Sequence, residues 1–349
     1  YTFTGLKSSS STSGVTYTTG PREIDAAIVG KNYHVIVIAN AGDMTSSCKE
    51  KKISEIRDMQ MDKVCTRNAD IANFTDFVMS SKKDAKIDFS GKPGSGTGTE
   101  SDPYMVDVNI ERLAARIDII PNATYVDTDK GYYYNVMDGT NVIGGFKLES
   151  VTPTKVMTSG EYLIKRVSSD AAVSTVTYYG EEEMNPTTKA STNYVVCPWT
   201  KDRTGLTLSN AEGPTSLYNV KETTSTSTAV KEASYILDYV MENTTTDNAE
   251  ANSTGLVFKG KYYELSDWDT ANKQPKAGKS GTDKYYTYTI RHSDPTGAGS
   301  KTDPMYYGIV RNNIYRVRID GITGKGPDGM KVTLHVRKWA TYTHDETTM

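Results

Sequence analysis

The sequence predicts a mostly β protein of two domains. At 349 residues and 38.4 kDa the chain is longer than a single hydrophobic core usually supports. It contains 24 Tyr against 6 Phe, together with many Thr and Ser residues, and this composition favours half-buried strands over amphipathic helices. We therefore expect β-sheet in both halves of the chain.

The first forty residues predict a loop followed by a core strand. Residues 1–20 are rich in Ser, Thr and Gly, which is typical of the end of a strand that enters a mobile loop. Residues 35–38 then form a continuous run of Val and Ile, ended by Asn40 and Gly42. Such a β-branched run predicts a strand that is covered on both faces.

A short helix is expected next, followed by a long strand. Ile53, Ile56 and Met59 recur at helical spacing behind two serines that can cap a helix. Residues 106–119 alternate between apolar and polar side chains, with one slip at residues 111–112, and so predict a strand with a bulge.

Two more strands, at residues 146–151 and 162–164, complete the first half. Residues 167–230 are dominated by Thr, Ser and Glu, with one apolar island at residues 194–199, so we place the domain boundary near Arg166. Further short strands are expected at residues 235–240, 256–258, 285–290, 306–310, 314–319 and 332–336. Short strands separated by turn residues predict a sandwich for the second half.

The last strand pattern is followed by a tail that alternates again. Val332, Leu334 and Val336 alternate with polar residues, and Trp339 then breaks the register. Beyond it, one face of the tail carries Ala340, Tyr342 and His344 and the other face carries Thr341 and Thr343. An uncovered edge strand invites pairing with another chain, so the pattern indicates a partner. We assign residues up to Val336 to the subunit itself and the tail to the partner.

Charge and motifs argue against several classes of function. The formal net charge of −3 and the pI near 5.9 provide no basic field for nucleic acid or anionic lipid, and no stretch approaches the ~20 apolar residues that cross a bilayer. None of the four histidines, His34, His292, His335 and His344, has a second ligand at metal spacing. We expect no catalytic residue and no cofactor.

Three glycine-containing segments have weak likenesses to ligand motifs. The glycine-rich run at 94–98 lacks the lysine of a phosphate loop, and at 299–302 the lysine is one place too late, so both are interpreted as turns. Residues 127–131 lack the third ligand before the glycine and the closing Glu of a calcium loop.

Two alternatives concern the cysteines and the aromatic residues. Cys48 and Cys65 flank the helical pattern and could form a disulfide, although three free thiols are equally compatible with three cysteines in a long chain. Trp268 and the cluster Tyr132, Tyr133 and Tyr134 could form a glycan-binding face instead of packing in the core.

Several segments, in the same order along nearly the whole chain, resemble the fimbrillins, the stalk subunits of Bacteroidales type V pili. The matching segments are residues 35–42, 112–118, 146–150, 196–199, 239–243, 311–315, 321–324 and the terminal strand ending at Trp339. The most specific part is Arg-Asn-Asn-x-Tyr at 311–315, followed by the last strand and Trp339.

The resemblance implies two transthyretin-like β-sandwich domains, at 1–166 and 167–338, and a donor-strand tail at 339–349. It implies export through the outer membrane as a lipoprotein precursor, and protease removal of an N-terminal strand that opens a groove for the next subunit's tail. The partners implied are other copies of the chain in a surface fimbrium that supports adhesion, with anchor and tip pilins. Mature subunits would not contact the membrane. Host or bacterial receptors, and an anchor or tip role, stay open alternatives. The donor residues would be Trp339, Ala340, Thr341, Tyr342, Thr343 and His344.

Overall fold

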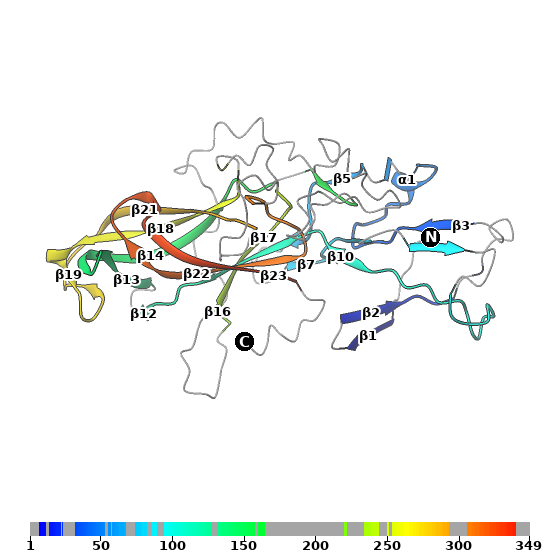
Figure 1. Ribbon diagram of the computed structural model, residues 1–349, viewed down its shortest axis with the longest axis horizontal. Helices are drawn as coiled ribbons and strands as arrows, with labels where there is room; N and C mark the ends of the chain where they lie inside the picture. The colour runs from blue at the N-terminus through cyan, green and yellow to red at the C-terminus, as the bar shows by residue number, and fades with distance from the viewer. Residues whose placement is uncertain are drawn as a thin grey trace.

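A computed structural model gives the architecture of the chain (Figure 1). It describes residues 7–11, 14–21, 23, 32–52, 55–56, 58–67, 74–81, 85–88, 94–126, 131–157, 160–164, 220–221, 234–243, 250, 253–292 and 306–339. The described residues are mostly β, as the composition predicts. In Figure 1 a β-sandwich occupies the left and centre, and smaller sheets from the N-terminal part of the chain lie to the right.

The first layer of the sandwich is antiparallel throughout. Its strands run in the order β12 (Thr124–Val126), β13 (Gly131–Asp138), β14 (Asn141–Thr154), β18 (Gly255–Glu264) and β21 (Thr282–Thr289). Apolar side chains such as Phe146, Leu148 and Phe258 point inward, and lysines such as Lys147 and Lys259 alternate with them on the outer face. This alternation is what a sheet with one buried face requires.

The second layer lies against the first. Its strands run in the order β16 (Val220–Lys221), β17 (Ser234–Val240), β11 (Ala115–Ile120), β22 (Asn313–Thr323) and β23 (Met330–Lys338). The β11–β22 pair is parallel and the β11–β17 pair is antiparallel. Ile117, Ile119, Val317 and Leu334 meet the inward side chains of the first layer in one hydrophobic core. Packing two inner faces together is the usual construction of a β-sandwich.

Strand β22 joins the two layers at one corner. A register shift between Ile319 and Gly321 bends the strand, and Ile322 then pairs in parallel with Val136 of β13 in the first layer. A bulge changes a strand's direction in this way because one residue is left out of the ladder.

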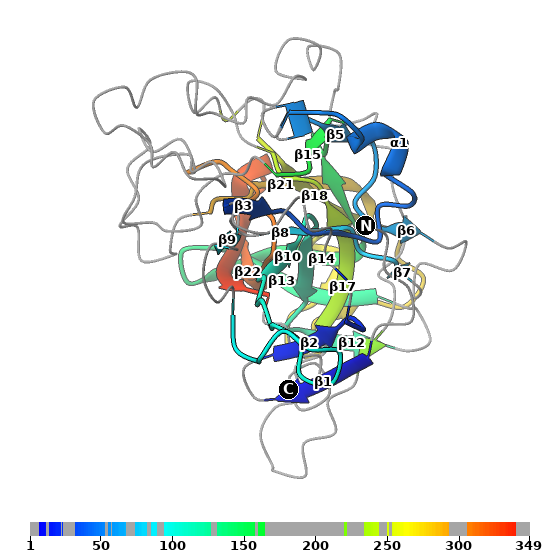
Figure 2. The same ribbon diagram turned by 90° about the vertical axis from the view of Figure 1, so that its right-hand side faces the viewer.

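The N-terminal part of the chain forms short strands and one helix. The pairs are β1 (Lys7–Ser11) with β2 (Gly14–Thr18), β3 (Asn32–Val35) with β9 (Ala85–Asp88), β5 (Gln60–Met61) with β15 (Glu161–Tyr162), and β6 (Thr66–Arg67) with β7 (Phe74–Thr75). Strand β8 (Met79–Ser81) lies between β4 (Ile38–Ala39) and β10 (Ile110–Arg112), and α1 spans Thr45–Cys48. Figure 2 views this part from its end, in front of the sandwich.

Strands from both sides of residue 166 share the sandwich. The chain leaves the N-terminal sheets at Leu113 and Ala114, which are fully buried. From residue 115 onward, β11 to β14 join the same sheet as β17, β18, β21, β22 and β23. The described strands are therefore not divided at residue 166. The expected boundary itself falls within 165–219, outside the described residues, and the division into domains 1–166 and 167–338 stays a prediction.

Several strand predictions differ from the structure. The expected core strand at 35–38 is split between β3 and β4, which pair with different partners, and its side chains are only half-buried. The expected strand at 106–119 is interrupted at 113–114, where the chain changes sheets. At residues 306–310 only Ile309 forms a bridge, to Asn243. In each case the hydrogen-bonding partner strand changes or ends along the apolar run, which the local pattern does not report.

The predicted helical segment and the glycine-rich run form a short helical turn and a tight turn. The Ile56 N–H donates to the Lys52 carbonyl at 3.1 Å, so a helical turn follows α1. At the glycine-rich run, the N–H groups of Thr97, Gly98 and Thr99 all donate to the Asp102 carbonyl, which forms a tight turn as predicted. Within the described residues, no helix is long and apolar enough to cross a membrane.

Candidate functional site

The candidate site is the end of β23, where the last strand of the sandwich passes into the tail. The strand pairs with β22 along its whole length, from Met330 opposite Ile322 to Lys338 opposite Asn313. Leu334 is buried in the sandwich core, and Val332 and Val336 pack against it. These three side chains therefore belong to the subunit's own fold, as the sequence predicts.

Trp339 is also part of the subunit's own core. Its side chain is only 7% exposed, and its backbone N–H donates to the Asn312 carbonyl at 2.7 Å. The indole stacks on Tyr239 with ring centroids 5.3 Å apart, meets Phe77 edge-on at 5.4 Å, and has the Arg112 guanidinium 4.5 Å from its centroid. Aromatic and cation–π contacts of this kind add to the burial energy of a large ring.

The implied donor strand from Trp339 to His344 stays a prediction, and the structure describes its first residue alone. In the single chain the ring of Trp339 packs against side chains from three segments of its own fold, Phe77, Arg112 and Tyr239. The break in register at Trp339 has a structural reason. The preceding apolar side chains of β23 pack in the sandwich core, whereas Trp339 packs in a second apolar cluster, which includes Val78 and Leu113. The remaining expected donor residues, Ala340, Thr341, Tyr342, Thr343 and His344, lie outside the described residues.

The segment before β22 fixes the start of that strand through a buried ion cluster. Arg311 is 0% exposed, and its guanidinium bonds Glu161 at 2.6 Å and Glu242 at 2.8 Å, both carboxylates being buried. It also donates to the carbonyls of Leu163 and Tyr162, at 3.2 and 2.6 Å. Arginine suits this role because its planar guanidinium presents five donors that can meet several acceptors at once.

The two carboxylates of this cluster face a single guanidinium. Desolvation raises the pKa of Glu161 to about 8, while the nearby Arg311 charge opposes that shift and the Glu242 carboxylate adds to it. The pKa of Arg311 is raised because Glu242, Glu161 and Glu111 together outweigh its own desolvation. The cluster therefore joins β15, the end of β17 and the start of β22 at a charged, water-excluded point.

The other residues of the Arg-Asn-Asn-x-Tyr segment shape the backbone. Asn312 has a left-handed φ of 56°, a conformation that Asn tolerates better than most residues, and its N–H donates to the Ala114 carbonyl at 2.8 Å. The Asn313 amide donates to the Val310 and Arg311 carbonyls. The Tyr315 hydroxyl lies 2.7 Å from His292 Nδ1 and accepts from the Val310 N–H at 2.7 Å. This histidine therefore has a structural hydrogen bond.

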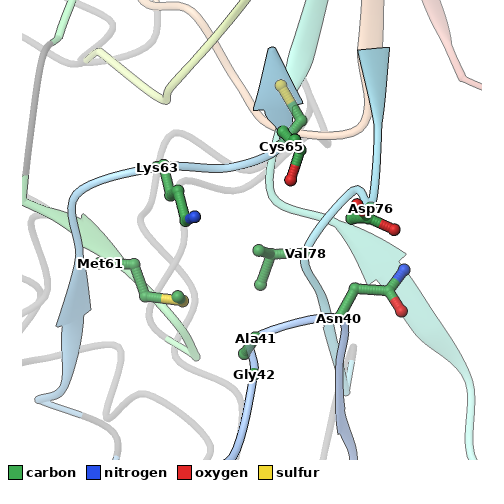
Figure 3. Close-up of a pocket in the computed structure, with 9 residues that line it drawn as sticks. Asn40, Ala41, Gly42, Met61, Lys63, Cys65, Asp76 and Val78 are labelled. Carbon is green, nitrogen blue, oxygen red and sulfur yellow. The ribbon is translucent and has the colours of Figure 1, made fainter. Parts of the chain in front are cut away.

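A cavity of about 370 Å³ lies in the N-terminal part, and Val78 in its lining belongs to the same apolar cluster as Trp339. It is lined by Asn40, Ala41, Gly42, Met61, Lys63, Cys65, Thr66, Asp76 and Val78. Figure 3 shows Met61 and Lys63 on one side of the space, facing Val78 and Ala41, with Asn40 and Asp76 beyond them. Its volume is at the lower end of the range of small-molecule pockets. Within the described part of the chain, no group of three metal-ligating side chains is assembled.

The cysteine pair is not joined in the structure. Cys48 ends α1, whereas Cys65 lines the cavity, and no disulfide connects them. Of the two alternatives, the structure therefore does not form the possible Cys48–Cys65 bridge, because spacing along the sequence does not determine separation in the fold. Cys197 and the calcium-like segment at 127–130 lie outside the described residues.

The aromatic residues of the alternative glycan-binding face are buried. Trp268 and Tyr133 are each 2% exposed, and the Trp268 indole N–H donates to the Asn135 side chain at 2.7 Å. Trp268 lies in the hairpin of β19 (Trp268–Asp269) and β20 (Gln274–Pro275), after the 3₁₀ turn η6 (Leu265–Asp267), and packs against Tyr133 and Tyr263 on the outer face of the first layer. The aromatic cluster therefore anchors this hairpin to the sheet.

Gly145 should be essential for that packing. A Cβ atom at this position would lie 1.9 Å from the Trp268 ring, so we expect Gly145→Ala to lower the free energy of unfolding by about 2–3 kcal/mol. Urea denaturation measures the change. Gly326→Ala is the matched control, since a Cβ there meets nothing within 4 Å. Equal stability of the two variants would contradict the packing.

Several important residues were not found by inspecting the sequence. Arg112 and Glu242 lie in segments that resemble fimbrillins, but their contacts were not predicted, and the signal at Glu161 was a charge at the edge of an apolar strand pattern. The apolar periodicity assigns such a charged residue to the solvent-facing side of a strand. In the fold, hydrogen bonds to Arg311, more than 60 residues away in sequence, stabilise the two glutamates in the protein interior.

Comparison with known proteins identifies part of this region. Residues 280–338 match the family model described as "Major fimbrial subunit protein type IV, Fimbrillin, C-terminal". The match covers β21, β22 and β23, with the 3₁₀ turn η7 (Pro327–Gly329), and ends one residue before Trp339. Over this segment the resemblance to fimbrillins is confirmed. No curated protein sequence matches the chain.

Solved structures of similar proteins have low sequence identity. A putative cell adhesion protein from Parabacteroides distasonis is 16% identical, covers 95% of this chain and 88% of its own length, and has a TM-score of 0.48. A fimbrilin (fimA) from Porphyromonas gingivalis is 15% identical, with coverages of 87% and 79% and a TM-score of 0.40. The tip fimbrial protein Mfa3 of the same species is 16% identical, with coverages of 87% and 79% and a TM-score of 0.38.

Proposed function

We propose that this chain, whose residues 280–338 are those of a fimbrillin C-terminal region, is a structural stalk subunit that polymerises head to tail in a cell-surface fimbrium. Its tail, residues 340–348, adds a strand to the next subunit after a protease has removed that subunit's N-terminal strand. One observation carries the proposal: the family match ends where Trp339 anchors the chain, and an alternating tail follows.

The position of Trp339 supports a tail that begins at residue 340. Up to Lys338 the chain is committed to the β22–β23 ladder, and Trp339 is held by its own subunit. Ala340, Tyr342 and His344 then fall on one face of an extended segment, with threonines on the other. A strand of nine residues reaches roughly 30 Å at ~3.3 Å per residue, enough to follow the edge of a sandwich.

The energetics require a prepared acceptor. Burying the few apolar side chains of the tail, at ~2 kcal/mol each, contributes less than the ~10–20 kcal/mol that it costs to order the backbone of such a segment. A groove with exposed core and unpaired backbone groups makes up the difference, because each new backbone hydrogen bond adds ~1 kcal/mol net. Addition of an extended segment to a sheet edge is a general mode of recognition between chains.

Two considerations separate this proposal from its alternatives. An anchor or tip subunit of the same fimbrium would share these domains, but a subunit at the tip has no need to donate a strand. The alternative of a surface glycan-binding module would use Trp268 and Tyr133, and both are buried. The proposed partners are other copies of this chain with anchor and tip pilins, and the proposed route is export as a lipoprotein precursor.

Deleting residues 340–349 while keeping Trp339 should abolish filaments. The variant retains the complete β23 and its anchor, so it should fold and still accept a strand, but it has none to donate. Fimbriae are counted by electron microscopy on cells that produce the precursor either with or without this deletion. Circular dichroism checks that the purified variant is folded. Undiminished filaments would contradict donation by the tail.

A pair of substitutions on the two faces of the tail gives a sharper control. Tyr342→Asp places a charge on the apolar face, whereas Thr343→Asp places the same charge on the adjacent residue of the opposite face. The first should prevent assembly and the second should preserve it. Equal effects would indicate that the tail does not enter a sheet with one buried face.

A further inference from the structure

We propose that Trp339, together with Phe77, Arg112 and Tyr239, forms a mechanical latch that passes tension from the tail into the body of the subunit. We call these four residues the Trp339 latch. The inference rests on the proposed function, because tension enters through residue 340 only if the tail is held by a neighbour. Trp339 acts here as a positioning residue that keeps β23 in its own subunit while the tail is pulled.

The latch lies at the point where a pulled tail would begin to peel the last strand. Residue 339 is followed directly by the tail, and Lys338, the residue before it, is the last of β23 and pairs with Asn313. A strand peeled from its end loses its ladder one residue pair at a time, so each step is opposed by only a few contacts. Before the first pair can open, the Trp339 ring must leave its enclosure and its N–H must leave the Asn312 carbonyl.

The residues that hold the ring come from different parts of the fold. Arg112 ends β10 in an N-terminal sheet, Tyr239 lies in β17 of the sandwich, and Phe77 lies between β7 and β8. Tyr239 is itself packed against Phe77 at 4.8 Å and Phe74 at 4.5 Å. A force applied to residue 339 is therefore shared between the N-terminal sheets and the second sandwich layer.

The buried ion cluster supports the strand β22, with which β23 is paired. Asn312, which accepts the Trp339 N–H, follows Arg311, and Arg311 is bonded to Glu161 and Glu242 on two other segments. The backbone that receives the pull from Trp339 is thus fixed within one residue of a buried three-membered ion cluster. A substitution at Trp339 removes the first barrier to peeling and leaves this support in place.

Single-molecule pulling on the isolated subunit tests the latch without requiring assembly. The full chain is held at its N-terminus and pulled either through a tag at its C-terminus or through a tag inserted at Gly278, an exposed turn where added atoms meet nothing within 4 Å. With the C-terminal tag, Trp339→Ala should open β23 on the order of a hundredfold faster at the same force, because a large buried ring is lost. With the Gly278 tag, the variant should open at nearly the wild-type rate.

The outcomes separate a latch from ordinary core packing. Equal acceleration with both attachments would show that Trp339 only stabilises the fold, and no acceleration with the C-terminal tag would show that it carries no load; either result overturns the proposal. Should Trp339→Ala fail to fold, Arg112→Gln and Trp339→Phe give the same comparison with smaller accelerations. Because the subunit is pulled alone, failure of this test leaves the tail-deletion experiment as a separate test of assembly.

Discussion

Replacing Arg311 by Met should lower the free energy of unfolding by about 3–5 kcal/mol at neutral pH. The substitution keeps much of the side-chain volume but leaves the Glu242 carboxylate buried without its counter-ion and Glu161 without its hydrogen-bond donor, and breaking a buried ion pair on one side costs about this much. It also removes the donors to the Leu163 and Tyr162 carbonyls. Urea denaturation followed by circular dichroism measures the loss.

Arg318→Met is the matched control for that substitution. Arg318 lies on β22, is 38% exposed, and pairs with Asp320 at 3.9 Å, so its loss should cost at most about 1 kcal/mol. Adding Glu161→Gln and Glu242→Gln to Arg311→Met should restore part of the lost stability, because no uncompensated charge then stays buried. A loss below about 1 kcal/mol for Arg311→Met would mean that the cluster does not hold the junction.

The same cluster predicts a stability that falls as the pH rises. Glu161 has an ordinary pKa of 4.5 and a raised pKa of about 8 in the folded protein. Below 4.5 the group is protonated in both states and its contribution is fully present; between 4.5 and 8 the unfolded state releases the proton more readily than the folded state, so stability is lost. One group with this behaviour contributes a slope of at most about 1.4 kcal/mol per pH unit.

Urea denaturation at a series of pH values between 5 and 8.5 tests this dependence. Other groups also titrate, so the informative quantity is the difference between the wild type and Glu161→Gln, which cannot ionise. We expect the wild type to lose stability relative to this variant as the pH rises. Glu264→Gln, at an exposed carboxylate that pairs with Lys325, should not change the profile in this range. Parallel profiles for the wild type and Glu161→Gln would contradict a raised pKa at Glu161.

Much of the sandwich follows from local pattern. The alternation at 146–151 and 332–336 locates β14 and β23 because each has one face in the core and one outside, and their partners are the same along the strand. The tyrosines at 132–134 were harder to interpret, since all three are buried: two point into the sandwich core and Tyr133 is covered from outside by Trp268. A strand buried on both faces by a later hairpin has no local signal.

The site was predictable in outline and not in its contacts. The Arg-Asn-Asn-x-Tyr segment and the register break at Trp339 directed attention to the correct region. The enclosure of Trp339 depends on Phe77 and Arg112, which lie more than 200 residues earlier, and the charge partners of Arg311 come from two other segments. Such pairings are decided by the tertiary fold, and a single sequence contains no periodicity that reports them.

The central claim is that residues 340–348 leave their own subunit and complete the next one. Electron cryomicroscopy of the assembled fimbrium tests it most directly, because the path of the chain after Trp339 can be followed in the density. We expect Trp339 to stay packed on Tyr239 of its own subunit, and Ala340, Tyr342 and His344 to lie inside the neighbouring subunit's sandwich. A tail that folds back on its own subunit, or that projects into solvent while the filament is intact, would contradict it.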